Sequence, residues 1–467
     1  MSWQTIVKEN NLEVSIIPAT KLEGAIRLDS DYYQAKYLKN KAFLGSKKCK
    51  TILELTDYVK KGIFDISPDK YLEEGVPLIR VKDIKGGFLD YSTMVFLSEE
   101  DHAKEKKTEL NVGDIVFSKV GTVGEVAIID KKSNFSQNVL GIKIKKKEIN
   151  PKYLLCFLLS PAGNYQIKRA EMISVQPKLE LTDIRELLVP VASSEFQDAV
   201  ASIVDASKEK KDKSSETYTE AEQMLLKEIN LEEYKGTEEA ISVRNFSEAI
   251  ADNRFDAEYW QPDFDVILET VSKYKKGIST IGDEFKQLKG NFKAEKDKEY
   301  SYVEIGDVNV STGEVDSNVI IGAELPANAK IKFGKRQLIT SKVRPNRGAT
   351  AILDNHEGYI GSGAFTVLTE QDSINLETLM VYLKAKPIRE LLLRYNTGTS
   401  YPVITDSDVL KLPIPLIDKS VQKKISELVS LSAKERQEAK VLLEKAKRAV
   451  EIFVEKDEKE AVAFIGK

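Results

Sequence analysis

The 467-residue chain is poor in the side chains that most often perform catalysis or bind metals. It has two histidines, His102 and His356, and two cysteines, Cys49 and Cys156, and none lies in the spacing of a metal site. A Ser/His/Asp or Cys/His catalytic site would need one of these histidines, and no nucleophile elbow accompanies either of them. We therefore interpret both histidines as surface residues and both thiols as buried or incidental groups, and we expect no metal ligand and no catalytic residue.

Other signatures of enzymes are missing as well. The segment GTVG at 121–124 lacks the remainder of a phosphate-binding loop, and Gly361-Ser362-Gly363 opens no predicted helix. The chain contains no Asn-Pro-Pro-aromatic motif of an adenine methyltransferase and no carboxylate cluster typical of a nuclease. These absences favour a binding protein over an enzyme.

Long apolar runs and a surplus of one charge are also absent. No stretch approaches the roughly 20 apolar residues of a membrane span, and MSWQTIVKENNLEV does not resemble a signal peptide. We therefore expect a cytoplasmic protein without membrane contact. The net charge of −4 is not typical of a nucleic-acid binder. However, the acidity is concentrated in one segment, because eleven acidic and only six basic residues fall within 205–240. The remainder of the chain has room for local basic surfaces.

What the sequence does contain is an internal repeat. RLDSDYYQ at 27–34 returns as RFDAEYWQ at 254–261, which is 227 positions later. Pro190 and Gln197 are matched by Pro415 and Gln422, each 225 positions later. Further matching pairs are QPKL at 176–179 with YPVI at 401–404, IRVKDI at 79–84 with VEIGDV at 303–308, and IVFSKV at 115–120 with LITSKV at 338–343. The nearly constant offset predicts two halves of the same design.

Each half combines predicted strands with predicted helices. The β-branched runs at 76–84 and 112–129 predict short strands. The segments 151–160 and 375–386 predict amphipathic helices, and Asn150-Pro151 is a typical helix start. A proline-bearing strand and a long charged helix then complete each half.

The two long helices carry similar heptad patterns. The last helix has apolar residues at both ends of its seam and polar Ser432 and Glu435 in the middle, and the earlier helix repeats this design around Ser207 and KEKKDKSSE. Each helix could pack on its own globule. However, a helix of about 35 residues extends roughly 50 Å, so we favour antiparallel pairing of the two helices, which would hold the globules apart.

The order of these motifs resembles a known family. IRVKDIKGG, GDIVFSKVGTVGEVAII, SQNVLGIKI, INPKYLLCFLLSPAG and SVQPKLELTDIRELLVPV are similar to a target-recognition domain of the DNA specificity (S) subunit of type I restriction–modification systems. YVEIGDV, LITSKVRP, GYIGSGAFTVL, LETLMVYLKAKPIRELL and SYPVITDSDVLKLPIPL in the second half resemble a diverged copy of that domain. The resemblance covers nearly the whole chain, and its motifs are individually loose but occur in order and twice.

The resemblance implies an α+β fold with two pseudo-repeated α/β target-recognition domains separated by two long antiparallel coiled-coil helices. The implied parts are an N-terminal segment at 1–26 that completes a helical region, domains at 27–192 and 251–417, a helix with its connector at 193–250, and a C-terminal helix at 418–467.

The family also implies a non-catalytic role. Each domain would read one half of a split site in double-stranded DNA, and the helices would set the gap and dock two modification (methyltransferase) subunits. Those subunits bring S-adenosylmethionine, and a restriction subunit that uses ATP and Mg²⁺ can join them, so that no cofactor belongs to this chain.

Candidate contact residues follow from turns between predicted strands and from the heptad seams. The expected DNA contacts, chosen because Arg, Lys, Asn and Gln bind phosphates and base edges, are Arg80, Lys82, Lys119, Thr122, Asn138, Gln176, Lys342, Arg344, Asn346 and Arg347. The expected partner-binding residues are Phe196, Val200, Ile203, Leu225, Val421, Ile425, Leu428, Leu442 and Phe453.

Alternatives remain open at this point. The second half has RPNRGA where the first has GTVGEV, and SGAF where the first has QNVL. These differences indicate either another DNA sequence preference or the loss of DNA reading in one half. The chain could also be a methyltransferase or nuclease of a DNA-defence system with an unrecognised site, or a coiled-coil adaptor with vestigial globules.

Overall fold

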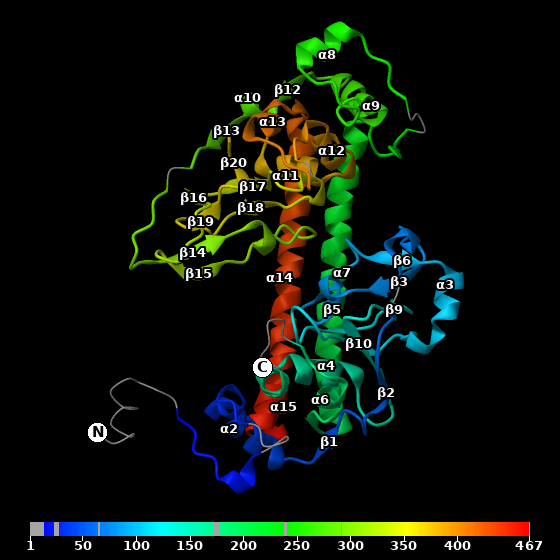
Figure 1. Cartoon of the computed structure of the whole chain (residues 1–467), viewed down its shortest axis with the longest axis vertical. Coiled ribbons are helices and arrows are strands. Elements are labelled where there is room, and N and C mark those ends of the chain that lie inside the picture. The colour runs from blue at the N-terminus through cyan, green and yellow to red at the C-terminus, as the bar shows by residue number, and fades with distance from the viewer. Residues whose placement is uncertain are drawn as a thin grey trace. The chain divides into compact units, whose positions relative to one another are not determined.

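The computed structural model of the chain divides into two compact units. The first unit contains residues 1–211 and 436–467, and the second contains residues 212–435. Both units mix helices and strands, which confirms the predicted α+β class (Figure 1). The residues that the structure describes are 14–22, 28–63, 66–171, 178–237, 241–290, 292–398 and 400–466.

A four-stranded antiparallel sheet lies at the centre of the first unit, in the order β2-β10-β7-β8. A second sheet, β6-β3-β9, contains one parallel pair, and β1 pairs with β11 and β4 with β5. The strands are β1 Cys49–Thr51, β2 Thr56–Lys61, β3 Val76–Ile79, β4 Ile84–Lys85, β5 Phe88–Leu89, β6 Val95–Leu97, β7 Ile115–Ser118, β8 Val126–Ile128, β9 Asn134–Phe135, β10 Val139–Ile144 and β11 Leu188–Pro190. The helices of this globule are α2 Ala35–Gly45, α3 Glu99–Lys104, α4 Pro151–Leu159, α5 Pro161–Ala170 and α6 Leu181–Arg185.

The second unit repeats this topology. Its central sheet has the order β13-β20-β17-β18, its second sheet β15-β14-β19-β16 again contains one parallel pair, and β12 pairs with β21. The strands are β12 Ile278–Thr280, β13 Phe285–Leu288, β14 Glu299–Val303, β15 Asn318–Ile321, β16 Ala329–Lys332, β17 Gln337–Ser341, β18 Thr350–Leu353, β19 Ile360–Ser362, β20 Phe365–Glu370 and β21 Pro413–Pro415. The helices are α8 Phe246–Asp252, α9 Pro262–Ser272, α10 Ile281–Glu284, α11 Leu376–Lys384, α12 Lys386–Leu391 and α13 Asp406–Lys411. The duplication seen in the sequence is therefore a duplication of the fold.

The helix start predicted at Asn150-Pro151 is confirmed, and the equivalent helix of the second unit begins in the same way. Asn150 precedes α4 and its side chain accepts a hydrogen bond from the Lys152 amide at 3.0 Å. Asn375 precedes α11 and accepts from the Thr378 amide at 2.9 Å. Each carboxamide thereby satisfies a backbone donor that the first helical turn leaves without a partner.

A buried glutamine fastens the long helix to its globule in each unit. Gln197 accepts from the Asn150 amide at 2.8 Å and donates to the Ala192 carbonyl at 3.0 Å. In the second unit, Gln422 accepts from the Asn375 amide at 3.0 Å and donates to the Ile417 carbonyl at 2.8 Å. We call this arrangement the glutamine clamp, because one side chain holds both the start of α4 or α11 and the segment that leads into the long helix.

The two long helices, α7 (Ser194–Glu228) and α14 (Lys419–Glu455), run antiparallel within each unit. In the first unit the rings of Phe196 and Phe453 lie 5.6 Å apart, and the Ser207 hydroxyl donates to the Ala439 carbonyl at 2.7 Å. In the second unit Ser214 pairs with Ser432. The short helix α15 (Glu458–Ile465) follows α14 and also contributes to the core of the first unit.

The polar middle of the predicted seam is hydrogen-bonded across the helices. In the second unit the Ser214 hydroxyl donates to the Ser432 carbonyl at 2.8 Å, and the Ser432 hydroxyl donates to the Ser214 carbonyl at 2.7 Å. Thr217 donates to the buried Glu435 carboxylate at 3.1 Å, which Lys213 also contacts at 3.2 Å. Each of these polar side chains therefore has a hydrogen-bond or ion-pair partner between the two helices, which offsets the cost of burying it.

The boundaries of the compact units differ from the domain boundaries proposed from the sequence. Each long helix is shared between the two units, because each half of a helix packs on the globule of its own unit. The proposed N-terminal segment at 1–26 lies largely outside the described residues, which there comprise only 14–22 with a 3-10 turn at Ala19–Lys21.

The glutamine clamp gives a first prediction. Replacing Gln422, which is 2% exposed, with alanine leaves the Asn375 amide and the Ile417 carbonyl without this partner. We expect a loss of about 2 kcal/mol in the free energy of unfolding, measured by urea denaturation, together with faster hydrogen exchange at the start of α11. Lys423→Ala is the matched control, since this neighbouring side chain is 79% exposed. Equal stability of the two variants would contradict the clamp.

Candidate nucleic-acid interface

A compact basic turn joins β17 to β18 in the second unit. Arg344 has a left-handed backbone conformation with φ of 51°, and the 3-10 turn Pro345–Arg347 follows it. The Arg344 guanidinium lies over the Tyr401 ring at 5.3 Å, and its amide donates to the Pro402 carbonyl at 2.7 Å. Arg344, Asn346 and Arg347 are exposed. The turn therefore presents three side chains that can bind phosphates or base edges from a backbone held in place.

Lys342 does not belong to this exposed group, and its expected DNA contact stays a prediction. Its ammonium pairs with Asp406 at 2.9 Å, and the same carboxylate accepts from the Thr366 hydroxyl at 2.6 Å. The side chain is 16% exposed. Lys342 thus joins β17 to α13 within the globule, and a DNA contact would require this ion pair to break.

The first unit has its corresponding turn after β7. The Lys119 amide donates to the Asn138 carbonyl at 3.0 Å, and the Lys119 carbonyl accepts from the Leu179 amide at 3.1 Å. Thr122 lies in the exposed turn itself, and Asn138 is exposed at the start of β10. The structure therefore brings together three of the predicted residues, Lys119, Thr122 and Asn138. Gln176 lies outside the described residues.

Two lysines that the sequence did not single out complete this basic group. Burial lowers the pKa of Lys119, and the positive charges of Lys61 and Lys178 lower it further. Glu180 is the opposing charge, and it pairs with Lys178 at 3.2 Å. Positive charges that lie close together and are partly desolvated repel each other, and a bound anion reduces this repulsion. A DNA phosphate is such an anion. Lys61 ends β2, and the adjacent pair Lys60-Lys61 is the only sequence signal that could have indicated it.

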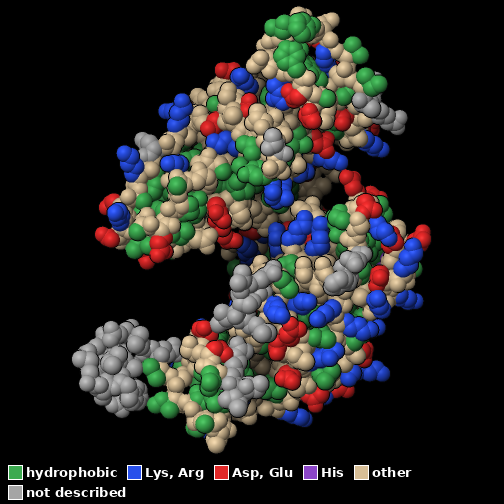
Figure 2. Space-filling view, in the orientation of Figure 1, with side chains coloured by type: hydrophobic (Ala, Val, Ile, Leu, Met, Phe, Trp, Pro, Cys, Tyr) green, Lys and Arg blue, Asp and Glu red, His purple; other side chains and the backbone are tan. Residues whose placement is uncertain are grey.

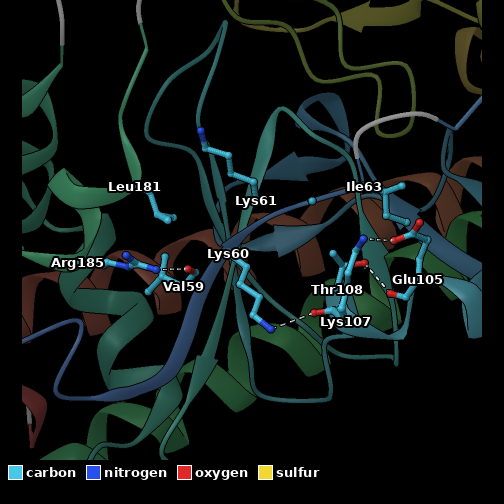
Figure 3. A pocket seen from close by; sticks show the side chains of 10 residues that line it. Val59, Lys60, Lys61, Ile63, Glu105, Lys107, Thr108, Leu181 and Arg185 are labelled. Carbon is cyan, nitrogen blue, oxygen red and sulfur yellow. Dashed lines mark hydrogen bonds and ion pairs between the residues drawn. The ribbon is translucent and has the colours of Figure 1, made fainter.

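Each unit has a hollow at the equivalent position beside these turns. In the first unit a hollow of about 510 Å³ lies between the end of β2 and α6, and Lys60, Lys61 and Arg185 contribute to its lining (Figure 3). In the second unit a hollow of about 590 Å³ lies between the end of β13 and α13, and Lys289 and Lys330 contribute to its lining. Basic, polar and apolar side chains all contribute to the lining of both hollows.

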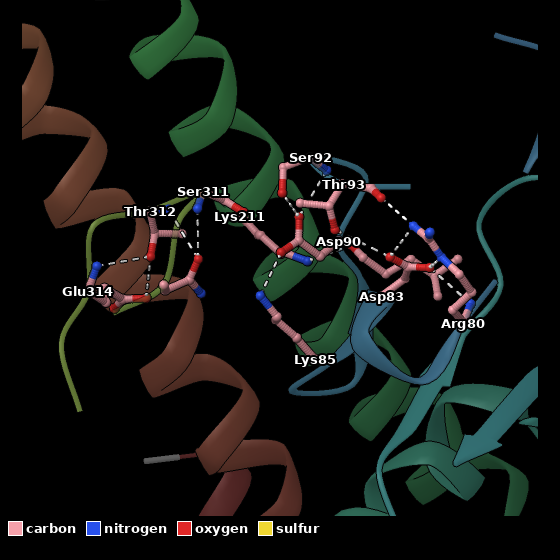
Figure 4. Close-up of polar contacts among 12 residues, drawn as sticks. Arg80, Asp83, Lys85, Asp90, Ser92, Thr93, Lys211, Ser311, Thr312 and Glu314 are labelled. Atoms are coloured by element: carbon pink, nitrogen blue, oxygen red, sulfur yellow. Dashed lines mark hydrogen bonds and ion pairs between the residues drawn. The ribbon is translucent and has the colours of Figure 1, made fainter. Parts of the chain in front are cut away.

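Arg80 has a structural role that the sequence did not indicate. Its guanidinium donates two hydrogen bonds to Asp83, at 3.0 and 3.3 Å, and a third to the Thr93 carbonyl (Figure 4). Asp83 is fully buried and closes the turn that follows β3 by accepting from the Arg80 amide at 2.9 Å. Arg80 thus forms a half-buried ion pair with Asp83, and its expected DNA contact stays a prediction. Lys82 lies in the same turn and is exposed.

The predicted partner-binding residues of the long helices face mainly inward. Five of them are buried in the hydrophobic cores of this chain, namely Phe196, Val200, Leu225, Ile425 and Phe453. Ile203, Val421 and Leu428 are half-buried against the same cores, and Leu442 is half-buried beside the buried Leu443. The apolar residues of each seam thus pack inside the chain, and their expected partner contacts stay a prediction.

Two of the few histidines and cysteines, His102 and Cys156, are buried inside the first unit. His102 is buried, contrary to the expectation of a surface histidine, and its ring nitrogens meet the Asn134 side-chain oxygen and, at 3.1 Å, Glu109. Burial raises the pKa of the Cys156 thiol to about 12, so its reactive thiolate is disfavoured. Among the described residues no group of three or more His, Cys, Asp or Glu side chains could hold a metal ion.

Comparison with known proteins identifies the family. The model of the type I restriction modification DNA specificity domain matches residues 26–223 and 274–439. These matches cover more than half of the chain and both of its repeats, and the chain belongs to this family.

Curated relatives are similar over part of their length. The specificity subunit of the type I restriction enzyme EcoBI from Escherichia coli is 28% identical over 134 residues, which are 28% of this chain and 28% of the relative. The specificity subunit of the type I restriction enzyme HindI from Haemophilus influenzae is 29% identical over 134 residues, which are 26% of this chain and 29% of the relative. The aligned regions thus span less than a third of these relatives.

Two solved structures are similar over most of the chain. The S subunit of a type I restriction–modification system from M. genitalium is 14% identical, covering 87% of this chain and 94% of that chain, with a TM-score of 0.38. The HsdS subunit from Thermoanaerobacter tengcongensis is 13% identical, covering 93% and 99%, with a TM-score of 0.29. At such scores the structural likeness adds nothing to the family match. No helix of the described chain is both long and apolar enough to cross a membrane.

The ion pair of Arg80 yields a second prediction. Arg80→Ala leaves the buried Asp83 carboxylate without its cation, whereas Lys82→Ala removes an exposed charge from the same turn. We expect Arg80→Ala to lower the free energy of unfolding by about 2 kcal/mol, and Lys82→Ala to change it by less than about 0.5 kcal/mol. Thermal denaturation of both variants measures the difference. A stable Arg80→Ala variant with weakened DNA binding would instead restore the role expected from the sequence.

The basic turn of the second unit yields a third prediction. We expect Arg344→Ala combined with Arg347→Ala to weaken DNA binding and to reduce the slope of log affinity against log salt concentration by about 2, one for each lost phosphate contact. The control removes two exposed charges elsewhere in the unit, Lys273→Ala with Lys423→Ala, at side chains 70% and 79% exposed. Fluorescence anisotropy over a salt series measures both. An unchanged slope in the arginine variant would contradict a DNA contact of this turn.

Proposed function

We propose that this chain is the DNA-specificity subunit of a type I restriction–modification complex, in which each unit reads one half of a bipartite site in double-stranded DNA. The observation that carries the proposal is the match of the DNA-specificity domain to both repeats, at residues 26–223 and 274–439. The exposed polar and basic turns that follow the equivalent Ser-Lys-Val sequences of the two repeats support it.

The chemistry of these turns fits DNA reading. Phosphate contacts supply salt-dependent affinity, and the lysines around Lys119 are suited to them. Arg344 and Arg347 are suited to phosphate contacts as well, and Asn346 between them can form two hydrogen bonds to one base edge, which contributes about 1–3 kcal/mol of discrimination for a good pair. Because the turn is GTVG in one repeat and RPNR in the other, the two halves would read different bases. The resulting target is split and asymmetric.

The catalytic steps would lie in partner subunits. We propose that two modification subunits bind this chain and methylate adenine with S-adenosylmethionine, and that restriction subunits using ATP and Mg²⁺ join the complex in the cytoplasm. None of these three cofactors would be held by this chain. The alternative, a methyltransferase or nuclease with an unrecognised site, requires the chain by itself to bind S-adenosylmethionine or to cut DNA.

Mapping of methylated adenines across the genome of a host that carries this chain and its modification subunit tests the proposal. We expect a motif with two defined parts and an undefined gap of constant length, and no methylation when either protein is omitted. Methylation of the same sites without this chain would refute the proposal. Stoichiometric binding of S-adenosylmethionine by the purified chain would favour the enzyme alternative.

A further inference from the structure

The basic turn of the second unit is supported by a side chain of the helix α12. The Arg389 guanidinium donates to the Asn346 carbonyl at 3.1 Å. This hydrogen bond holds the peptide group between Asn346 and Arg347, so it limits the directions in which these two exposed side chains leave the turn. Arg389 is half-buried, and its neighbour Ile388 lies in the hydrophobic core of the unit. The turn is therefore connected to a helix that the core holds in place.

Gly348, which ends the turn, leaves room for this support. Its backbone has a left-handed φ of 73°, and a Cβ atom at this position would lie only 2.8 Å from the Arg389 Cδ. A larger residue would therefore be strained and would push the Arg389 side chain away from the turn. Arg389 thus contacts the turn both by a hydrogen bond and by close packing of its aliphatic part.

The first unit supports its corresponding turn in another way. Gly124, which ends that turn as Gly348 ends the other, has a left-handed φ of 94°. A Cβ atom at Gly124 would lie 3.1 Å from the Ile167 Cγ2 on α5, which is an apolar contact. Counting from the proline in the first turn of α5 and of α12, the position of Arg389 is taken by Gly163. The hydrogen-bonded support therefore belongs to the turn that carries the arginines.

The long helix α7 supplies a negative charge close to Arg389. Burial raises the pKa of Glu222 on α7, and the positive charges of Arg389 and Lys384 oppose this rise. A hydrogen bond from the Lys386 backbone, at the start of α12, opposes it as well. Both helices also contribute apolar residues to the core of the second unit. The Glu222 carboxylate is thus a counter-charge for Arg389 where α7 meets α12.

We propose that Arg389 is a positioning residue for sequence reading by the second unit. It holds the turn 344–348 in the conformation in which Asn346 reaches a base edge, and Glu222 links this support to the long helix α7. Such support matters because a binding side chain has to be held within about 0.5 Å of its productive geometry. This role rests on the proposed function and adds the residue through which one reader is aligned with its helix.

DNA binding by the full chain with its modification subunit tests this role. The probes are DNA duplexes that carry the methylated motif found by genome mapping, and duplexes in which one half of that motif is altered. The ratio of the two affinities measures discrimination at each half-site. Arg389→Met keeps the aliphatic part of the side chain but loses its donors and its charge. We expect this variant to reduce the ratio about tenfold at one half-site, as for one lost base contact, and to leave the other half-site unchanged.

Three further variants show whether Arg389 acts through Asn346. Asn346→Ala should reduce the ratio at the same half-site, and adding Arg389→Met to it should change the ratio by less than about twofold. Arg389→Lys keeps a positively charged donor for the Asn346 carbonyl, so its ratio should stay within about threefold of the unaltered complex. Glu222→Gln removes the counter-charge and should reduce the ratio at this half-site by about threefold.

A control on α12 separates positioning from a change in net charge. Figure 2 shows basic and acidic side chains next to each other over the part of the molecule that Figure 1 labels α12. Lys386→Met removes a positive charge from this helix at a side chain that is 63% exposed, and it should leave discrimination at both half-sites unchanged. The slope of log affinity against log salt concentration should be the same for Arg389→Met and the unaltered complex, because no phosphate contact is lost.

The outcomes distinguish this role from the proposed function. Equal affinity of the unaltered complex for the motif and for the altered duplexes would overturn both. Normal discrimination by Arg389→Met would overturn only the positioning role, and so would a salt slope reduced by about 1, because Arg389 would then bind a phosphate itself. If Arg389→Met is unfolded, the other two variants carry the test. Discrimination that is reduced at one half-site in Glu222→Gln and retained in Arg389→Lys supports the role, and any other pair of results overturns it.

Discussion

The glutamine clamp is the interaction on which the arrangement of each unit depends. Gln197 and Gln422 each accept from the amide of the residue that caps a buried helix and donate to a carbonyl of the segment that leads into a long helix. A buried carboxamide destabilises a protein unless its N–H donors and its carbonyl acceptor have hydrogen-bond partners. Loss of one of these hydrogen bonds would therefore leave a buried polar group unpaired. The clamp thereby ties the start of a long helix to its globule, and apolar residues of the same helix belong to the hydrophobic core of that globule.

A rigid framework of this kind leaves the turns free to differ. The strand order of the central sheets is the same in both units, and the isolated bridges Val120 to Lys178 and Val343 to Val403 hold equivalent loops beside the turns. Nothing in these backbone contacts requires GTVG at one position and RPNR at the other. A scaffold that is constant and turns that vary are what a protein needs if its two halves read different DNA sequences.

The long helices show how polar groups can be kept inside a helix pair. Ser214 and Ser432 exchange hydrogen bonds with each other's carbonyls, and Thr217 and Lys213 satisfy Glu435. Such a group is stable in only one alignment of the two helices, because a shift by one turn would leave the buried oxygens without partners. The weak middle of the heptad seam is therefore a determinant of register.

The sequence by itself determined the duplication, the α+β class, the helix starts at Asn150 and Asn375, and the apolar seams of the long helices, because these follow from local periodicity and capping. It also located the exposed basic turn at 344–347. Only the tertiary structure decided that Arg80 and Lys342 turn inward to Asp83 and Asp406 and that His102 is buried. It alone placed Lys61 and Lys178 beside Lys119. The direction in which a charged side chain points depends on partners that folding brings near it, and most of these partners lie far away in the sequence.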